Sequence, residues 1–146
     1  MLFRTVAAIG LAAGIISGSS AFAQATGVDP YGDWTLSDGR LTVKVVSCNG
    51  NQVCANLVRL QEPNNGDGTP KLDLKNKNAA LRSRHLIGMP VLENMVATGP
   101  NTWKGLIYSS DDGDNYRGYA TVDGDHLSVK GCWFIICRDL NFYRAK

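Results

Sequence analysis

The sequence predicts an all-β protein, folded as a single antiparallel up-and-down barrel of about eight strands. Short segments alternate apolar and polar residues with a period of two, and clusters of Gly, Asn, Asp and Pro separate most of them. After the first 23 residues no stretch shows the apolar period of a helix, although 78–84 has room for one helical turn. A two-sheet sandwich also fits short hairpins, but closing the sheet removes its exposed edges, and we therefore favour the barrel.

The first 23 residues are predicted to be a signal peptide. Arg4 supplies the positive start, an apolar run follows, and Ala21-Phe22-Ala23 has the small-residue pattern of a cleavage site. The apolar run is shorter than the roughly 20 residues that cross a bilayer, so we expect no transmembrane segment. Cleavage after Ala23 leaves residues 24–146 as a single β-barrel domain, periplasmic if the host is a Gram-negative bacterium.

Eight segments carry the strand pattern, and they lie at residues 33–36, 40–47, 53–61, 85–96, 102–108, 116–122, 126–130 and 137–143. The second is the clearest, because Leu41, Val43 and Val45 alternate with Thr42 and Lys44. Most of the turns between segments are short, which places consecutive strands side by side. An eight-stranded barrel is either filled by its own side chains or holds one small ligand, and the sequence leaves both outcomes open.

The four cysteines predict two disulfides, because all of them lie in the exported part of the chain. Three pairings are possible. We favour Cys48–Cys54 and Cys132–Cys137, since each pair brackets a short turn-like segment that brings the two Cα atoms within the reach of a disulfide. A zinc site is the alternative, but these spacings are wider than those of common zinc motifs.

Residues 62–85 form the one long connection, and connections of this length usually have a function or are disordered. The segment opens with turn formers and then becomes basic. Its basic residues are Lys71, Lys75, Lys77, Arg82 and Arg84, against the single acid Asp73 in that stretch. We therefore expect the loop to be a candidate contact surface for an envelope protein, a glycan or an anionic lipid. The formal net charge of +2 is too weak to predict nucleic-acid binding.

Calcium is a weaker hypothesis for the start of the same loop. Asn64, Asp67 and Asp73, with Asn65 beside them, supply the oxygen ligands that Ca²⁺ prefers. The segment does not match the calcium-loop pattern of EF-hands, and Asn and Asp are also ordinary turn residues. We therefore expect no metal and no cofactor.

An ordered set of short motifs runs along the chain. They are Asp29-Pro30-x-Gly32-x-Trp34, Asp38-Gly39-Arg40, Glu62-Pro63-Asn64, Asp67-Gly68-x-Pro70-Lys71-x-Asp73, Asn78-x-x-Leu81-Arg82-x-Arg84 with Gly88, and Gly131-Cys132 with Cys137-Arg138. Together with the Cys48/Cys54 pair, this set resembles an uncharacterised family of exported bacterial proteins, the domain of unknown function 2147. The resemblance implies a lipocalin-like (calycin-type) barrel and a periplasmic location, and it brings no established enzymatic activity.

Gly32-x-Trp34 is also similar to the G-x-W signature of lipocalins, in which the Trp packs beneath an Arg from the barrel end. Either Arg138 or Arg144 is the candidate for that position, where a cation–π contact would close one end of the barrel. This assigns Trp34 to stability and not to ligand binding.

Ligand pockets combine aromatic walls with a few placed polar groups. On that basis six residues are candidates for ligand contact: Arg59, Arg82, Arg84, Trp103, Tyr108 and Tyr116. Strand register decides whether Trp103 or Tyr108 points into the barrel, because a slip of one residue exchanges the two faces of a strand.

The sequence offers no catalytic constellation. His85 and His126 lie far apart in the sequence, and neither G-x-S-x-G nor H-E-x-x-H occurs. We therefore expect a non-enzymatic protein that binds a small apolar or amphipathic ligand. The alternative is an interaction or structural protein of the envelope that uses the basic loop.

Overall fold

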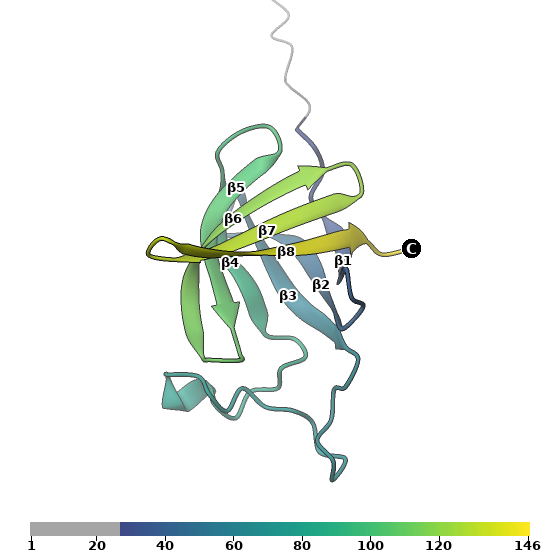
Figure 1. Ribbon diagram of the computed structural model, residues 1–146, viewed down its shortest axis with the longest axis vertical. Coiled ribbons are helices and arrows are strands. Elements are labelled where there is room, and N and C mark those ends of the chain that lie inside the picture. The colour runs from purple at the N-terminus through teal and green to yellow at the C-terminus, as the bar shows by residue number, and fades with distance from the viewer. Residues whose placement is uncertain (1–26) are drawn as a thin grey trace, which may run out of the picture.

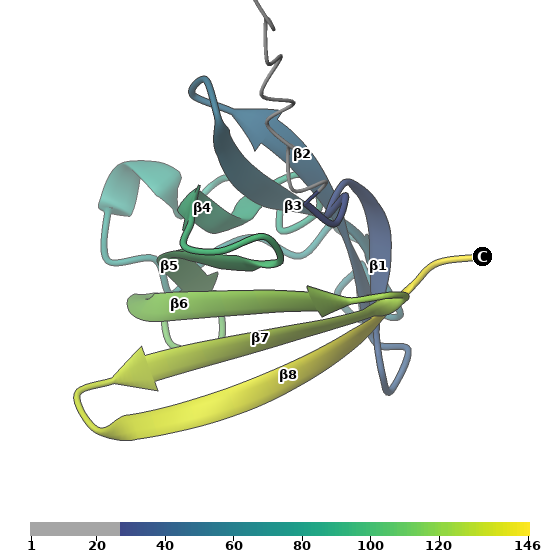
Figure 2. The same cartoon turned by 90° about the horizontal axis from the view of Figure 1, so that it is seen from above.

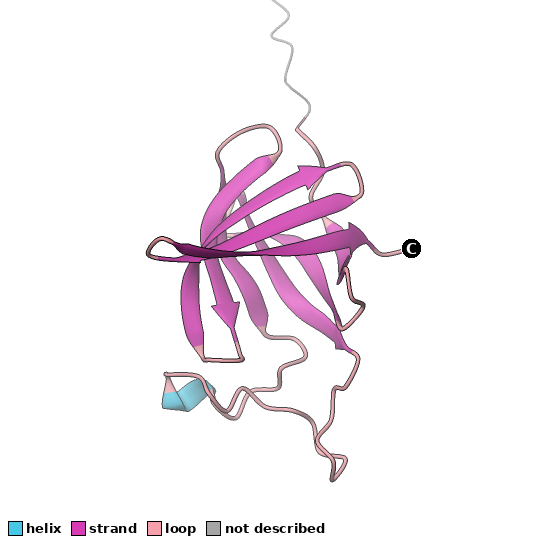
Figure 3. Cartoon of the chain, viewed as in Figure 1, coloured by secondary structure: helices cyan, strands magenta, loops and turns pink. Residues whose placement is uncertain are grey.

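The computed structural model describes residues 27–146, which form a closed barrel with one long loop (Figure 1). The predicted signal peptide, residues 1–23, lies outside the described residues. In the described part of the chain, the helical content is one 3-10 turn, η1 (Ala79–Leu81), inside the segment where the sequence left room for it (Figure 3). Within the same range, no helix is long and apolar enough to span a membrane.

The prediction of an eight-stranded antiparallel barrel is confirmed. The strands are β1 (Gly32–Leu36), β2 (Leu41–Cys48), β3 (Gln52–Leu60), β4 (Pro90–Ala97), β5 (Thr102–Ser109), β6 (Asp114–Asp123), β7 (His126–Trp133) and β8 (Ile136–Arg144). Each strand pairs with the next, and β8 closes the ring on β1, with Trp34 opposite Arg144 and Leu36 opposite Phe142. The closed order leaves no free sheet edge.

The fourth strand begins later than predicted, at Pro90 instead of residue 85. The residues before it make other hydrogen bonds. His85 forms an isolated bridge with Leu72 inside the long loop. The Gly88 N–H donates to the Leu57 carbonyl over 2.6 Å, and the Leu57 N–H donates to the Met89 carbonyl over 2.9 Å. This segment therefore joins the long loop to β3 before β4 begins.

The last hairpin is longer than predicted. The ladder between β7 and β8 continues through Cys132 opposite Cys137 to Trp133 opposite Ile136. The predicted strands were 126–130 and 137–143, whereas β7 runs to Trp133 and β8 begins at Ile136. The hairpin projects from the side of the barrel, as Figure 2 shows.

Both predicted disulfides are present, Cys48–Cys54 and Cys132–Cys137, and no cysteine of the described chain is free. Each clamps the end of a hairpin, the first between β2 and β3 and the second between β7 and β8. The zinc alternative is therefore wrong for these cysteines, because each sulfur atom is bonded to its partner in one of the two disulfides.

The two ends of the barrel differ in what covers them (Figure 1). The turns after β2, β4 and β6 lie at one end, together with the start of β1 and the end of β8. We call this the closed end. The turns after β1 and β5 lie at the opposite end with the long loop, residues 61–89, which joins β3 to β4. We call this the open end.

Candidate functional site

The barrel is hollow towards its open end. A cavity of about 560 Å³ lies among apolar side chains of β1 to β5, β7 and β8. Its apolar wall includes Leu36, Val43, Leu57, Leu92, Ile107, Leu127, Val129 and Phe142. Pockets for small molecules typically have volumes of about 300–1,000 Å³ and mostly apolar linings. This part of the barrel therefore has the size and the lining of a small-molecule pocket.

The rim of the cavity is polar and carries both signs of charge. It comes from the turn after β1, the long loop and the turn after β5, and its polar members are Arg40, Gln61, Glu62, Lys71, Ser109, Ser110 and Asp111. Lys71 and Glu62 form an ion pair across 3.8 Å. The long loop also contributes Leu86 and Met89 to the apolar lining. The loop therefore forms part of the pocket and does not hang free of the barrel.

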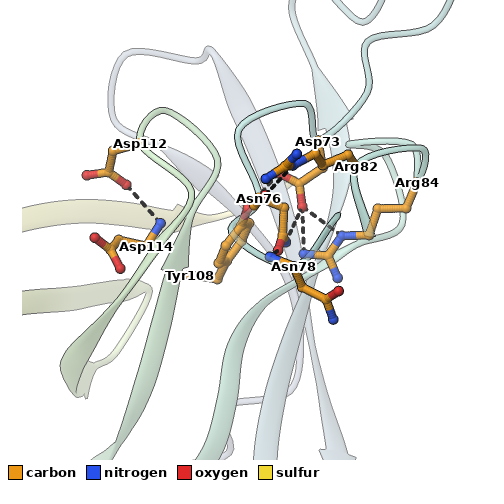
Figure 4. Close-up of polar contacts among 8 residues, drawn as sticks. All are labelled: Asp73, Asn76, Asn78, Arg82, Arg84, Tyr108, Asp112 and Asp114. Carbon is orange, nitrogen blue, oxygen red and sulfur yellow. Dashed lines mark hydrogen bonds and ion pairs between the residues drawn. The ribbon is translucent and has the colours of Figure 1, made fainter. Parts of the chain in front are cut away.

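The long loop is held by a buried carboxylate, Asp73, whose side chain is fully shielded from solvent (Figure 4). The Tyr108 hydroxyl donates to Oδ1 over 2.6 Å, and the Asn76 amide donates to Oδ2 over 2.8 Å. The Arg84 guanidinium donates from Nε to the same Oδ2 over 2.9 Å, and its Nη2 lies 2.8 Å from that oxygen in an ion pair. A buried charge needs such partners, and here a β5 residue and two loop residues supply them.

The hydrogen bonds of this cluster set the pKa values of two groups. Burial alone would raise the pKa of Asp73, but the hydrogen bonds from Tyr108, Asn76 and Arg84, together with the Arg84 charge, outweigh it and lower that pKa. Burial and the bond to Asp73 raise the pKa of Tyr108 to about 12. At neutral pH the carboxylate is therefore ionised and the phenol is neutral, which is the pair of states that the hydrogen bond requires.

A second set of contacts ties the same loop to the turn after β5. The Lys75 ammonium donates to the Asp111 carbonyl over 2.6 Å, and Lys77 forms an ion pair with Asp114. At Gly113, which has a φ of 73°, a Cβ atom would lie 1.8 Å from the Lys75 carbonyl oxygen. No other residue fits this close approach of the two main chains, so Gly113 allows the loop to lie against the barrel.

The three predicted arginines lie outside the cavity lining. Arg84 is committed to Asp73. Arg82 donates from Nε to the Asn76 carbonyl over 2.7 Å, which shapes the turn that contains η1. Arg59 donates to the Thr42 hydroxyl over 3.1 Å and, through Nη2, to a carbonyl of the turn after β1 over 2.8 Å. These cations hold the loop and turns in place around the open end.

Of the three predicted aromatic residues, Tyr108 lines the cavity and the other two do not. Trp103 is buried at the start of β5, at the closed end of the barrel. Tyr116 donates to the Asp112 carboxylate in the turn after β5. This hydrogen bond and burial raise the pKa of Tyr116. Of the six predicted residues, Tyr108 therefore lines the cavity and Trp103 lies at the closed end. The three arginines and Tyr116 make contacts in the loop and turns of the open end.

The residues of the calcium hypothesis do not share a site. Asp67 accepts hydrogen bonds from Thr69 in an exposed turn, and Asn64 pairs with Pro70 in an isolated bridge. Asp73 is buried among its own donors. Across residues 27–146, no group of three or more His, Cys, Asp or Glu side chains is placed to hold a metal ion.

At the closed end, Arg144 lies over the Trp34 ring, with its guanidinium carbon 4.3 Å from the ring centre. Trp34 has no exposed surface, and its indole N–H donates to the Pro30 carbonyl over 2.9 Å. The guanidinium also donates to the carbonyl oxygens of Tyr31 at 2.8 Å and Asp29 at 3.0 Å. The contact anticipated from the G-x-W motif thus joins the last strand to the residues that enter the first strand.

Arg138, the other candidate for this contact, lies elsewhere. It sits on β8 opposite Gly131, close to the clamped end of the last hairpin, and its side chain is exposed. Position along the strand is the reason, because β8 ends at the closed end and Arg138 is near its start.

Sequence reasoning missed the contact between Asp73 and Tyr108 at the open end. Asp73 appeared as a calcium ligand, because nothing local announces that it folds inward to meet Tyr108. Tyr108 lies next to Ile107 near the end of β5, where both line the cavity, and Asp73 and Arg84 of the loop contact it there. One signal in the sequence was available. Asp73 is the single acid among the basic residues 71–84, so it was the candidate to form an ion pair with one of those cations.

The comparisons with known proteins agree with this fold. Residues 32–144 match a family described as "Uncharacterized protein conserved in bacteria (DUF2147)". The barrel is similar to a solved structure described as "Protein HP1028 from the human pathogen Helicobacter pylori belongs to the lipocalin family". That similarity has a TM-score of 0.68 and 21% sequence identity, and it covers 82% of this chain and 84% of the other. No curated protein sequence matches the chain. The chain therefore belongs to this uncharacterised bacterial family, and its fold is a lipocalin-like barrel.

Proposed function

We propose that the barrel binds a small apolar or amphipathic molecule in its cavity. The observation that supports this is the cavity itself, about 560 Å³ of space with an apolar wall and a polar rim. An apolar body would displace water from the wall, and each Å² of apolar surface removed from water contributes about 25 cal/mol. A polar group of the ligand would remain at the rim, near Arg40, Lys71 and Asp111.

We propose a binding role without catalysis. Asp73 and Tyr108 have shifted pKa values, and such groups are candidates for an active site. Here Tyr108 donates a hydrogen bond to Asp73, and Arg84 forms an ion pair with Asp73. The pKa shifts favour the charged carboxylate and the neutral phenol, which are the states that this loop contact requires. Their arrangement is better explained as a structural lock than as an acid–base pair.

We also propose that the protein acts after export, in the periplasm of a Gram-negative host. The predicted cleavage pattern at residues 21–23 supports this location, and so do the two disulfides, which persist in oxidising compartments. The mass of the protein recovered from the periplasm tests it, because cleavage after Ala23 leaves a chain that begins at Gln24.

The docking alternative for the basic loop finds little support. Each of its five cations already has a partner within the chain. Lys71, Lys77 and Arg84 form ion pairs with Glu62, Asp114 and Asp73, and Lys75 and Arg82 donate to the main-chain carbonyls of Asp111 and Asn76. A docking surface needs cations that are free to meet the partner's charges. We therefore do not extend that alternative.

Binding of the fluorescent apolar probe N-phenyl-1-naphthylamine tests the cavity proposal. Val129→Trp adds bulk to the cavity wall, whereas Val96→Trp adds the same bulk to a half-exposed position outside the lining. We expect saturable probe fluorescence for the wild type and Val96→Trp, and at least a tenfold weaker affinity for Val129→Trp. Thermal denaturation of both variants checks that they fold, since overpacking costs about 1–3 kcal/mol. Equal probe affinity in all three proteins would contradict the proposal.

A further inference from the structure

The end of the β7–β8 hairpin carries four consecutive large apolar residues that are exposed to solvent. They are Trp133, Phe134, Ile135 and Ile136, with 59%, 72%, 96% and 63% of their surfaces exposed. We call these residues the apolar tip. Single exposed apolar residues are common on proteins, but a contiguous group of this size usually marks a contact surface.

The fold holds the apolar tip outward. The Cys132–Cys137 disulfide closes the hairpin directly behind it, and Trp133 pairs with Ile136 across the ladder. The turn itself has a residue poorly suited to it, because Phe134 has a φ of 50°, where hairpins usually have Gly or Asn. The chain therefore has apolar residues at this turn although Gly or Asn would suit the turn better and although their exposure to water is unfavourable.

The other stapled hairpin provides the contrast within the same molecule. Cys48–Cys54 closes the β2–β3 turn in a similar way, but the residues there are Asn49, Gly50 and Asn51. These are polar residues that suit a tight turn. A disulfide clamp alone therefore does not require an apolar tip.

The shape and charge of the apolar tip fit a lipid surface. It is convex, and the Trp133 and Phe134 rings pack edge to face with their centres 5.0 Å apart. Tryptophan and phenylalanine at a protruding loop favour the boundary between lipid headgroups and acyl chains. A soft surface accepts a convex apolar group without a preformed groove, whereas a protein partner would need a groove of matching shape.

The residues behind the apolar tip are mainly basic. Arg117 donates from Nη2 to the Phe134 carbonyl over 2.8 Å, and Arg138 follows directly after Cys137 with an exposed side chain. Lys130 lies 3.7 Å from the carboxylate of Asp139, on the same face of the hairpin as Arg117, and Arg138 lies on the opposite face. The nearby acids Asp112 and Asp114 are engaged by Tyr116 and Lys77. A positive collar around an apolar tip complements anionic lipid headgroups.

We propose that the apolar tip inserts into the headgroup region of an anionic phospholipid bilayer, with Arg138 and its basic neighbours meeting the lipid phosphates. The contact stands independently of cavity binding.

Intrinsic fluorescence tests the insertion directly. Trp34 and Trp103 are buried, so Trp133 is the tryptophan whose surroundings change on contact with lipid. The full chain is expressed in a Gram-negative host, and the protein is purified after the host has processed it. It is then titrated with vesicles of phosphatidylglycerol and phosphatidylethanolamine, or of phosphatidylcholine alone. We expect a blue shift of the emission and sedimentation with the anionic vesicles.

The double substitution Phe134→Asn with Ile135→Gly removes the apolar surface and installs a favoured turn pair, so the hairpin should still form. Each fully buried apolar side chain is worth at least about a tenfold change in partitioning, so vesicle affinity should fall by more than tenfold. Val96→Asn, at an exposed position outside the hairpin, is the matched control and should bind as the wild type does. Arg138→Gln should weaken binding to anionic vesicles about fivefold at low salt, and less at high salt.

Three results would overturn the proposal. The first is a wild-type protein that neither shifts its emission nor sediments with anionic vesicles. The second is a Phe134→Asn, Ile135→Gly variant that binds vesicles as the wild type does. The third is concentration-dependent dimerisation in sedimentation velocity that the double substitution abolishes while vesicle binding persists, because the apolar tip would then serve a second copy of the chain. Loss of probe binding in Val129→Trp with normal vesicle binding separates the two proposals.

Discussion

Each end of the barrel places an arginine against an aromatic ring, but the two arginines have different partners. At the closed end, Arg144 lies 4.3 Å from the centre of the Trp34 ring and donates to main-chain carbonyls. At the open end, Arg84 lies 5.1 Å from the centre of the Tyr108 ring and pairs with the buried carboxylate of Asp73. One closure therefore depends on backbone geometry, and the other on the ionisation of a single side chain.

This difference predicts which end responds to pH. The carboxylate that accompanies Arg144 belongs to Asp125, whose side chain is 86% exposed, and exposed ion pairs contribute little to stability. Asp73 has no exposed surface, so its charge must be matched within the protein. The loop at the open end, which also forms part of the cavity rim, is therefore the titratable part of the fold.

The largest expected effect is at the open end. Asp73→Asn leaves Arg84 without its charged partner and should lower the free energy of unfolding by about 2–4 kcal/mol at neutral pH. Urea denaturation followed by tryptophan fluorescence measures the loss. Asp67→Asn, in an exposed turn of the same loop, is the control and should change the midpoint far less. An equal loss in the two variants would show that the loop is not held through Asp73.

The same variant gives a pH test. The folded-state pKa of Asp73 lies below its ordinary value of 3.8, so its contribution to stability is present above that pH and is lost as the pH falls through the lower folded value. The difference in unfolding free energy between the wild type and Asp73→Asn should be constant from neutral pH to about pH 5 and shrink below about pH 4. A difference in unfolding free energy that persists unchanged at low pH would show that the charge of Asp73 is not what holds the loop.

At the closed end we expect a smaller effect without this acid dependence. Arg144→Met removes the cation–π contact and two hydrogen bonds and should cost about 1–2 kcal/mol. Arg144→Lys keeps the charge but cannot reproduce the planar set of donors, so it should recover little of that loss. Thermal or urea unfolding at pH 5 and pH 8 should give the same difference from wild type. Full recovery with lysine would mean that charge alone closes this end.

Tyr108→Phe should cost about 1 kcal/mol at neutral pH, because Oδ1 of Asp73 loses its donor. The pKa of Tyr108 is raised to about 12, so its contribution is present in full below the ordinary value of 10.0 and is lost as the pH rises through the folded value. The stability difference between the two proteins should therefore narrow between pH 10 and pH 12. Unfolding curves collected between pH 10 and pH 12 measure this difference. A stability difference that grows with pH would contradict the raised pKa of Tyr108.

The smallest effect is expected at the exposed tie between the loop and the turn after β5. Lys77→Gln removes the ion pair with Asp114, in which both side chains are largely exposed. The unfolding free energy should change by no more than about 0.5 kcal/mol, and the change should vanish at high salt. A loss comparable to that of Asp73→Asn would place the main attachment of the loop at Lys77 instead.

Much of the fold was accessible from the sequence because its contacts are local. Period-two alternation, the short turns and the cysteine pairs all concern residues near one another in the chain. The closed-end contact was also accessible, since the G-x-W motif singled out Trp34, and Arg144 was one of two arginines considered. The choice between Arg144 and Arg138 required the register of β8.

The open end was harder to predict because its contacts are distant in sequence. Asp73 and Tyr108 are brought together by a loop with no repeating pattern. Strand alternation gives no information about which loop residue contacts a side chain near the end of a strand, as Asp73 contacts Tyr108. The apolar tip escaped notice for a related reason, because Trp133 to Ile136 look like an ordinary buried run until the structure shows them outside the barrel.

The pairing of β1 with β8 has a consequence for the order of folding. Trp34 and Arg144 stand opposite each other although 110 positions separate them (144 − 34). All the other strand pairs of the barrel join strands that follow one another in the sequence. Local hairpins form early, and a contact between distant segments must first overcome the entropy of closing the intervening loop. Until β8 arrives, β1 and β7 present unpaired edges that invite aggregation. The final strand therefore ends the interval in which a folding chain is most vulnerable.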